Sequence, residues 1–83
     1  MKIIVADDEK IALKTLVEAI NEAYPEAEVK AFRKASEVIE YAEENKADVA
    51  FLDIELGYMS GIEVAKKLKQ KNPKIYIIFA TGY

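Results

Sequence analysis

Oxygen-bearing side chains stand directly after three apolar segments of this 83-residue chain. They are Asp7 and Asp8 after residues 3–6, Asp53 after residues 49–52, and Thr81 after residues 75–80. Ligands of an open parallel sheet bind at the carboxyl ends of its strands, where these positions would meet. We therefore expect three carboxylates and one hydroxyl to converge on one site. Such a group could hold a divalent cation beside a reactive aspartate.

The pair Asp7-Asp8 has two interpretations. Aspartate is favoured at helix N-termini, where it accepts a backbone N–H bond and complements the helix dipole. The alternative is a cation site, because carboxylates ~4–5 Å apart repel by several kcal/mol at an effective dielectric constant of about 20. Bound Mg²⁺ would relieve that repulsion with oxygen ligands. Asp53 could then act as a nucleophile toward phosphorus, and the Thr81 hydroxyl could donate to a phosphoryl oxygen.

The composition restricts the chemistry to oxygen ligands. The chain has no cysteine and no histidine, which excludes disulfides, thiolate ligands and imidazole ligands and favours a hard cation such as Mg²⁺. The net charge is −3 and the basic residues are scattered, so no nucleic-acid surface is expected. The one basic run, residues 66–71, fits the solvated face and last turn of a helix.

Length and hydrophobicity indicate one small domain. With 83 residues, 52% of them hydrophobic, the chain can form a single core but has little stability to spare. No apolar stretch approaches the ~18 residues of a membrane span, and the N-terminus lacks the layout of a signal peptide. We expect residues 1–83 to form one domain, located in the cytoplasm and without a membrane partner.

Hydrophobic periodicity predicts alternating strands and helices. Continuous apolar runs indicate strands covered on both faces, whereas strict alternation is typical of an edge strand; the former are residues 2–6, 47–53 and 74–80, and the latter is 28–32. Apolar residues at three- and four-residue steps indicate helices over residues 9–23, 35–42 and 62–68, the last ended by Asn72-Pro73. Residues 54–60 should form a loop between the third strand and the third helix. The order βαβαβαβ predicts a parallel, doubly wound α/β sheet.

Four segments of the chain resemble a known family in residue type and order. They are Asp7-Asp8 after the first strand, Phe51–Glu55, Met59–Glu63 and Thr81-Gly82. Together they are similar to the receiver domain of two-component response regulators, and most similar to receivers attached to LytTR-type DNA-binding domains. The resemblance covers the whole chain and implies the flavodoxin-like (CheY-like) form of the doubly wound fold.

The resemblance implies a phosphorylation switch rather than an enzyme. Asp53 would accept a phosphoryl group from a sensor histidine kinase. Asp7, Asp8, Asp53 and the backbone carbonyl of Glu55 would hold Mg²⁺, and Thr81 would move toward the phosphoryl group and carry the signal to a distal surface. The chain would then be a phosphoprotein of a two-component pathway, with any self-phosphorylation or dephosphorylation intrinsic to the domain.

Two features depart from the family pattern. Gly57 stands where proline is usual and Tyr58 where glycine is common, which loosens the loop but leaves the acidic site untouched. The chain also ends at Tyr83, without the helix, the lysine-bearing fifth strand and the last helix of the family, and Lys74 precedes the fourth strand at its wrong end. We therefore expect a truncated receiver that binds Mg²⁺ but is phosphorylated less readily.

This early end would leave residues 75–80 at the edge of the sheet, apolar on both faces. Loss of the last helix would also leave the sheet face beside the first helix partly bare, and large exposed apolar patches are rare in soluble monomers. We expect the chain to form a homodimer. The fourth strands would pair antiparallel about a two-fold axis, and each first helix would help to cover the partner's bare face.

Two other interpretations remain open. The chain could be a truncated flavodoxin-like scaffold that self-associates and whose acidic site is a relic. Less favoured is a haloacid-dehalogenase-like phosphatase, which also uses a strand-end aspartate with Mg²⁺ but usually has a second aspartate two residues later, where this chain has Glu55. Mg²⁺ binding would distinguish a receiver from the scaffold, because a relic distorted by truncation should bind the ion weakly or not at all.

Overall fold

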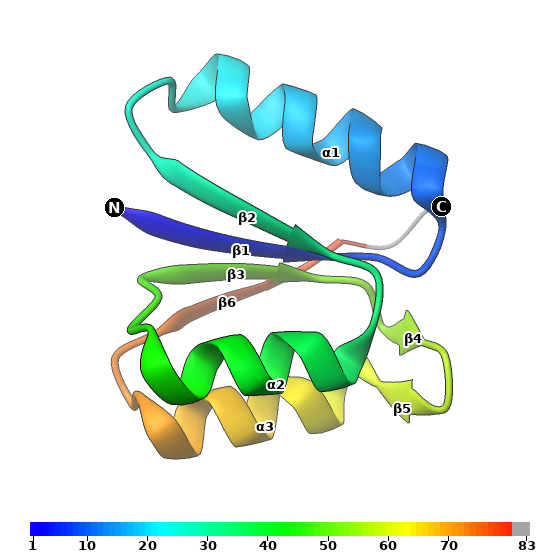
Figure 1. The fold of residues 1–83 in the computed structure, drawn as a ribbon, viewed down its shortest axis with the longest axis vertical. Coiled ribbons are helices and arrows are strands. Elements are labelled where there is room, and N and C mark those ends of the chain that lie inside the picture. Colours follow the sequence, from blue (N-terminus) through cyan, green and yellow to red (C-terminus); the bar gives the residue numbers. More distant parts are fainter. Residues whose placement is uncertain (81–83) are drawn as a thin grey trace.

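The computed structural model describes residues 1–80, which form a four-stranded parallel sheet with helices on both faces (Figure 1). In chain order the elements are β1 (Lys2–Ala6), α1 (Lys10–Ala23), β2 (Glu28–Phe32), α2 (Ala35–Glu44), β3 (Val49–Leu52), β4 (Glu55–Leu56), β5 (Met59–Ser60), α3 (Gly61–Lys71) and β6 (Tyr76–Phe79). The strand order is β2-β1-β3-β6, and each neighbouring pair is parallel. The predicted doubly wound α/β fold is confirmed.

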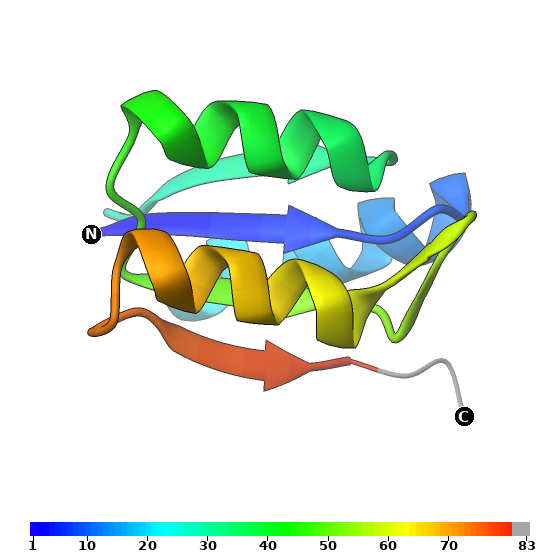
Figure 2. The same cartoon turned by 90° about the horizontal axis from the view of Figure 1, so that it is seen from below.

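Helices cover the two faces of the sheet unequally (Figure 2). On one face α1 packs over β1 and β2, with Leu13 and Ile20 against Ile3 and Val5. On the other face α2 and α3 lie side by side above a larger buried cluster. β1 is therefore covered on both faces, which explains its continuous apolar sequence. No helix in the described residues is long and apolar enough to cross a membrane.

β2 forms one edge of the sheet, as its alternating sequence predicts. It pairs only with β1 among the described strands. Within this strand Val29 and Phe32 are half-buried and the other residues are exposed. Val29 packs against the buried cluster on the α1 face and Phe32 against the cluster on the other face, so β2 is only partly covered on each face.

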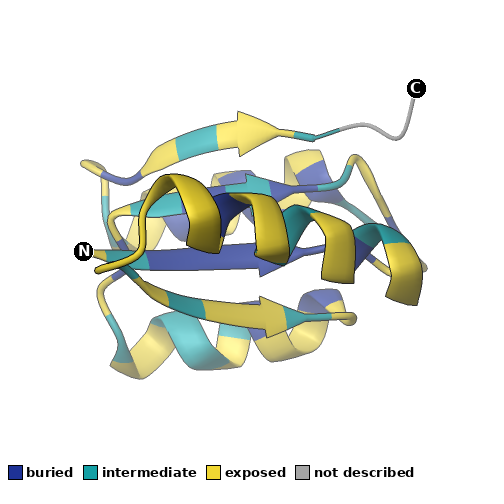
Figure 3. Ribbon diagram, turned by 90° about the horizontal axis from the view of Figure 1, so that it is seen from above, coloured by how far each residue is buried: buried dark blue, intermediate teal, exposed yellow. Residues whose placement is uncertain are grey.

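β6 forms the other edge of the sheet within residues 1–80, and it is unusually exposed for an apolar strand (Figure 3). The exposed fractions are 60% for Tyr76, 38% for Ile78 and 43% for Phe79. On the face that α1 covers, exposure increases from the buried residues of β1 through the half-buried Val49 and Phe51 of β3 to β6. The predicted apolar edge and partly bare sheet face are therefore present in the described part of the chain.

The predicted loop of residues 54–60 instead contains a two-stranded hairpin. β4 and β5 pair antiparallel, with Glu55 opposite Ser60 and Leu56 opposite Met59. Gly57 has a φ of 73°, a left-handed conformation that glycine adopts without strain and that suits a tight hairpin turn. Strands of two residues are too short to produce a periodic pattern, which is why the sequence predicts only a loop here.

Candidate functional site

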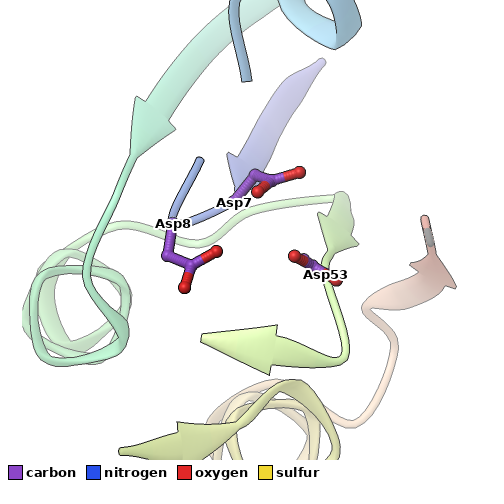
Figure 4. Close-up of side chains that lie close together, drawn as sticks. All are labelled: Asp7, Asp8 and Asp53. Atoms are coloured by element: carbon purple, nitrogen blue, oxygen red, sulfur yellow. The ribbon is translucent and has the colours of Figure 1, made fainter. Parts of the chain in front are cut away.

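Three aspartates gather at the carboxyl edge of the sheet (Figure 4). Asp7 and Asp8 follow β1, and Asp53 follows the neighbouring strand β3. Each of the three offers one carboxylate oxygen, and these oxygens all lie within 4.8 Å of one another. The Asp53 N–H donates to the Ala6 carbonyl at 2.9 Å, which continues the β1–β3 ladder and aligns the two strand ends. The convergence expected of the three carboxylates is therefore present.

The backbone around Asp7 holds its carboxylate in place. The Asp7 N–H donates to the Phe32 carbonyl at 3.2 Å, and Asp7 Oδ1 accepts a hydrogen bond from the Glu9 N–H at 2.9 Å. Helix α1 starts at Lys10 with Glu9 as its N-cap residue, and the Glu9 side chain makes no capping hydrogen bond. Neither Asp7 nor Asp8 is therefore the N-cap residue of α1, although Asp7 accepts a backbone N–H just before the helix, as the capping interpretation expects. Both carboxylates also belong to the acidic cluster.

Asp53 is fixed from two sides. Its Oδ1 accepts a hydrogen bond from the Glu55 N–H at 3.3 Å. Behind it, the Gly61 N–H donates to the Ile54 carbonyl at 2.6 Å, and a β-carbon on Gly61 would overlap the backbone carbonyl oxygen of Asp53. The first residue of α3 therefore packs directly against the Asp53 backbone, and only glycine fits there. A glycine at the start of a predicted helix was the available signal for this contact.

The electrostatics of the cluster favour a bound cation. The pKa of the Asp7 carboxyl is raised above its ordinary value of 3.8. Desolvation by burial is the largest cause, and the neighbouring Asp53 and Asp8 carboxylates raise it further, whereas the hydrogen bond from the Glu9 N–H lowers it. A divalent cation among the three carboxylates would replace repulsion with attraction.

The donor set of the cluster fits Mg²⁺. All three side chains supply carboxylate oxygens, which suit a hard cation. Asp7 is buried, Asp53 is half-buried and Asp8 is exposed, so the cluster opens to solvent on one side. That opening leaves room for the waters that Mg²⁺ usually retains. The backbone carbonyl of Glu55 stays a predicted ligand, and Thr81, predicted to supply a hydroxyl, lies outside the described residues.

Arg33 also reaches the site, although no sequence motif singled it out. Its Nε and Nη2 donate to the backbone carbonyl of Asp8 at 3.4 and 3.2 Å. Arg33 directly follows β2, so it stands at the same carboxyl edge of the sheet as Asp7 and Asp53. The strand-end argument used for the aspartates would have identified it had it been extended from acidic and hydroxyl side chains to basic ones.

Comparison with known sequences identifies similar proteins. The family model of the response regulator receiver domain matches residues 3–83. Sensory transduction protein LytT of Bacillus anthracis is 40% identical over 87 residues, covering 100% of this chain and 34% of LytT. An uncharacterized response regulatory protein of Vibrio cholerae is 33% identical over 81 residues, covering 96% of this chain and 31% of that protein. The chain thus spans about a third of the length of the curated relatives that it matches.

Solved structures agree with the fold. Response regulator protein TrrA of Thermotoga maritima, solved in complex with Mg(2+)-BeF, matches with a TM-score of 0.87 and 30% identity, covering 99% of this chain and 70% of that one. The BeF3-activated DrrB receiver domain matches with a TM-score of 0.83 and 30% identity, covering 96% of this chain and 64% of that one. The predicted CheY-like, flavodoxin-like architecture is confirmed.

Proposed function

The chain belongs to the response regulator receiver domain family, and we propose that it is a Mg²⁺-dependent phosphoacceptor whose acceptor is Asp53. Receiver domains are signalling domains, so we assign the chain to two-component signal transduction rather than to catalysis on a separate substrate. One observation carries the proposal. The carboxylate of Asp53, at the end of a central strand, shares a 4.8 Å cluster with the carboxylates of Asp7 and Asp8.

The proposed Mg²⁺ ligands are Asp7, Asp8, Asp53 and the backbone carbonyl of Glu55. The raised pKa of Asp7 supports this assignment, because it reflects burial next to two other carboxylates. The similar protein TrrA was solved with Mg(2+)-BeF, which also favours this ion. Bound Mg²⁺ would neutralise charge on the oxygens of the transferring phosphoryl group.

Transfer to Asp53 would form a bond between a carboxylate oxygen and phosphorus. With a phosphohistidine donor, the phosphorus–nitrogen bond breaks, and the departing imidazole nitrogen keeps its electron pair and is protonated from water. The Glu55 N–H restrains rotation of the Asp53 carboxylate through its bond to Oδ1. The solvent-open side of the cluster, next to Asp8, leaves the donor a path to Asp53. Thr81 is the hydroxyl that we assign to contact the phosphoryl group after transfer.

We assign a sensor histidine kinase as the partner that supplies the phosphoryl group. The family resemblance of the chain and its LytT relative support this partner. The reaction would take place in the cytoplasm, where such kinases meet their receivers. A polypeptide of these 83 residues should be phosphorylated more slowly than longer receivers, because no residue after Ala80 supplies the lysine of the family pattern. Electrostatic contacts to a transition state are worth roughly 3–4 kcal/mol in comparable sites.

We further propose that this 83-residue polypeptide forms a homodimer through residues 75–80. The N–H groups of Tyr76 and Ala80 donate to the carbonyls of Asp48, just before β3, and Leu52, at its end. The N–H groups of Ile77 and Phe79, which alternate with them, therefore face the open edge. An antiparallel pair centred on Ile78 would place residue 77 of each copy opposite residue 79 of the other in hydrogen-bonded pairs. The partly bare sheet face beside β6 would be covered in the same step.

Intact-mass measurement tests the phosphoacceptor proposal. The protein is incubated with phosphoramidate and MgCl₂, with and without excess EDTA. We expect a gain of about 80 Da, the mass of one phosphoryl group, in the wild type with Mg²⁺ but not with EDTA. Asp53→Asn should show no gain. Asp48→Asn, the same change at the amino end of the same strand, should behave as the wild type.

The same experiment separates the competing interpretations. A phosphoryl adduct that persists in Asp53→Asn would place the acceptor elsewhere and overturn the proposal. No adduct in any variant, together with no heat of Mg²⁺ binding in calorimetry, would favour a scaffold with a relic acidic site.

A further inference from the structure

Arg33 ties the segment that carries Asp8 to the end of β2. Its guanidinium donates two hydrogen bonds, from Nε at 3.4 Å and from Nη2 at 3.2 Å, to the same backbone carbonyl of Asp8. One residue earlier, the Asp7 N–H donates to the Phe32 carbonyl at 3.2 Å. Successive residues of the acidic segment are therefore joined to successive residues at the end of β2. This connection spans 25 positions of the sequence and does not involve α1.

The three aspartates are held by different means. The Asp7 carboxylate accepts the Glu9 N–H, and the Asp53 carboxylate accepts the Glu55 N–H. Asp8 is the exposed member of the cluster, and the contact that the structure records for it is the pair of bonds from Arg33 to its carbonyl. Because both bonds go to the main chain, the Asp8 carboxylate stays available to the cluster. Arg33 is therefore the residue that contacts the backbone of this third aspartate from a distant segment.

We propose that Arg33 is a positioning residue of the metal site: by holding the Asp8 backbone it keeps the Asp8 carboxylate beside those of Asp7 and Asp53 and strengthens Mg²⁺ binding. This inference rests on the proposed function, which takes the three carboxylates as Mg²⁺ ligands. Groups that orient metal ligands without touching the metal typically change metal affinity about 10–100-fold when they are removed.

The charge of Arg33 and its hydrogen bonds to Asp8 should have opposite effects on Mg²⁺ affinity, which allows a decisive test. A guanidinium near a cation site repels the cation, so loss of its charge alone would tighten Mg²⁺ binding. Loss of its hydrogen bonds to the Asp8 carbonyl would weaken Mg²⁺ binding. Lys34 provides the matched control, because it lines the same open cavity as Asp8 and Arg33 and its side chain does not cap α2.

Mg²⁺ titration by isothermal calorimetry decides between the two effects. We expect Arg33→Met, which retains length but cannot donate, to weaken Mg²⁺ binding roughly tenfold. Arg33→Lys, which keeps the charge and one donor group, should lie between Arg33→Met and the wild type. Lys34→Met should bind as tightly as the wild type or slightly more tightly. Equal or tighter binding by Arg33→Met would overturn the proposal.

Amide hydrogen exchange in metal-free protein provides a readout that does not depend on Mg²⁺. In Arg33→Met we expect faster exchange at Asp7 and Glu9, whose N–H groups bond to the Phe32 carbonyl and to Asp7 Oδ1. We expect no change at Asp53, whose N–H bonds to Ala6 of β1. Unchanged exchange at Asp7 and Glu9 would refute the positioning role even if Mg²⁺ affinity fell. If the wild type bound no Mg²⁺ at all, the proposed function would fail, and these exchange rates would still decide whether Arg33 orders Asp8.

Discussion

Gly61 packs so closely behind Asp53 that a β-carbon on the glycine would overlap the backbone carbonyl oxygen of the aspartate. The contact joins the first residue of α3 to the residue that follows β3, and the bond from the Gly61 N–H to the Ile54 carbonyl closes the hairpin between them. The proposed phosphoacceptor is therefore positioned by a helix and a hairpin that follow it in the chain, as well as by its own strand.

Gly61→Ala should disturb the site and lower stability. The new methyl group must displace either α3 or the Asp53 backbone, so we expect a loss of roughly 2–3 kcal/mol in the free energy of unfolding and weaker Mg²⁺ binding. Gly57→Ala is the control, because its β-carbon meets open space and its cost is the strain of a positive φ, about 1 kcal/mol. Urea denaturation and Mg²⁺ titration of both variants measure these effects. A loss in Gly61→Ala no larger than that in Gly57→Ala would contradict the close packing.

Asp7→Asn should stabilise the metal-free protein at neutral pH. The folded-state pKa of Asp7 is raised, so the folded protein holds this proton more tightly than the unfolded chain does. The resulting stabilisation is fully present below the ordinary pKa of 3.8 and is lost as pH rises through the raised value, where ionised Asp7 opposes folding. We expect Asp7→Asn to raise Tm at pH 7 and to leave it unchanged at pH 3.

Thermal unfolding in EDTA at the two pH values measures this difference. Asp48→Asn is the control, because Asp48 is exposed at the opposite end of β3 and lies outside the acidic cluster. A Tm of Asp7→Asn below that of the wild type at pH 7 would show that the buried carboxylate does not oppose folding.

Mg²⁺ affinity should fall as the pH is lowered through the raised pKa of Asp7. A proton on Asp7 competes with the metal, and burial of the Asp7 carboxyl favours that proton. At pH 7, Mg²⁺ at 100 times its Kd should raise the free energy of unfolding by about 2.7 kcal/mol. Calorimetric titrations across this pH range test the prediction. An affinity that is constant with pH, or one unaffected by Asp7→Asn, would remove Asp7 from the ligand set.

Ile78→Lys should abolish the proposed homodimer. In the antiparallel pair centred on residue 78, the two copies of this side chain face each other, so two lysines would repel and also bring charge to an apolar edge. Sedimentation at micromolar concentration should show a dimer for the wild type and a monomer for Ile78→Lys. Tyr58→Lys places the same charge on the β4–β5 turn, at a residue that is 87% exposed, and should leave the dimer intact. A monomeric wild type would disprove the dimer directly.

The order and type of the main elements, and the residues that follow each strand, could be predicted from the sequence. The continuous apolar runs of β1 and β3 and the helical steps of the segments between them are local patterns, and they depend on burial that a doubly wound sheet imposes along the chain. The prediction that Asp7, Asp8 and Asp53 meet needed only the rule that parallel strands end at one edge. The β4–β5 hairpin was not predicted, because strands of two residues are too short to show hydrophobic periodicity.

Only the tertiary structure decided which contacts hold these side chains, how far apart they lie and how deeply they are buried. Asp7 and Asp53 are 46 residues apart, and the distance between their carboxylates depends on the β1–β3 register that the bond from Asp53 to Ala6 fixes. Contacts between distant segments also bury Asp7, which raises its pKa, and bring Arg33 within hydrogen-bond distance of the Asp8 carbonyl. Local periodicity records which face of an element is buried, but it carries no information about which distant backbone a given side chain will meet. Residue types and strand ends therefore specified the chemistry of the site, and packing determined its geometry.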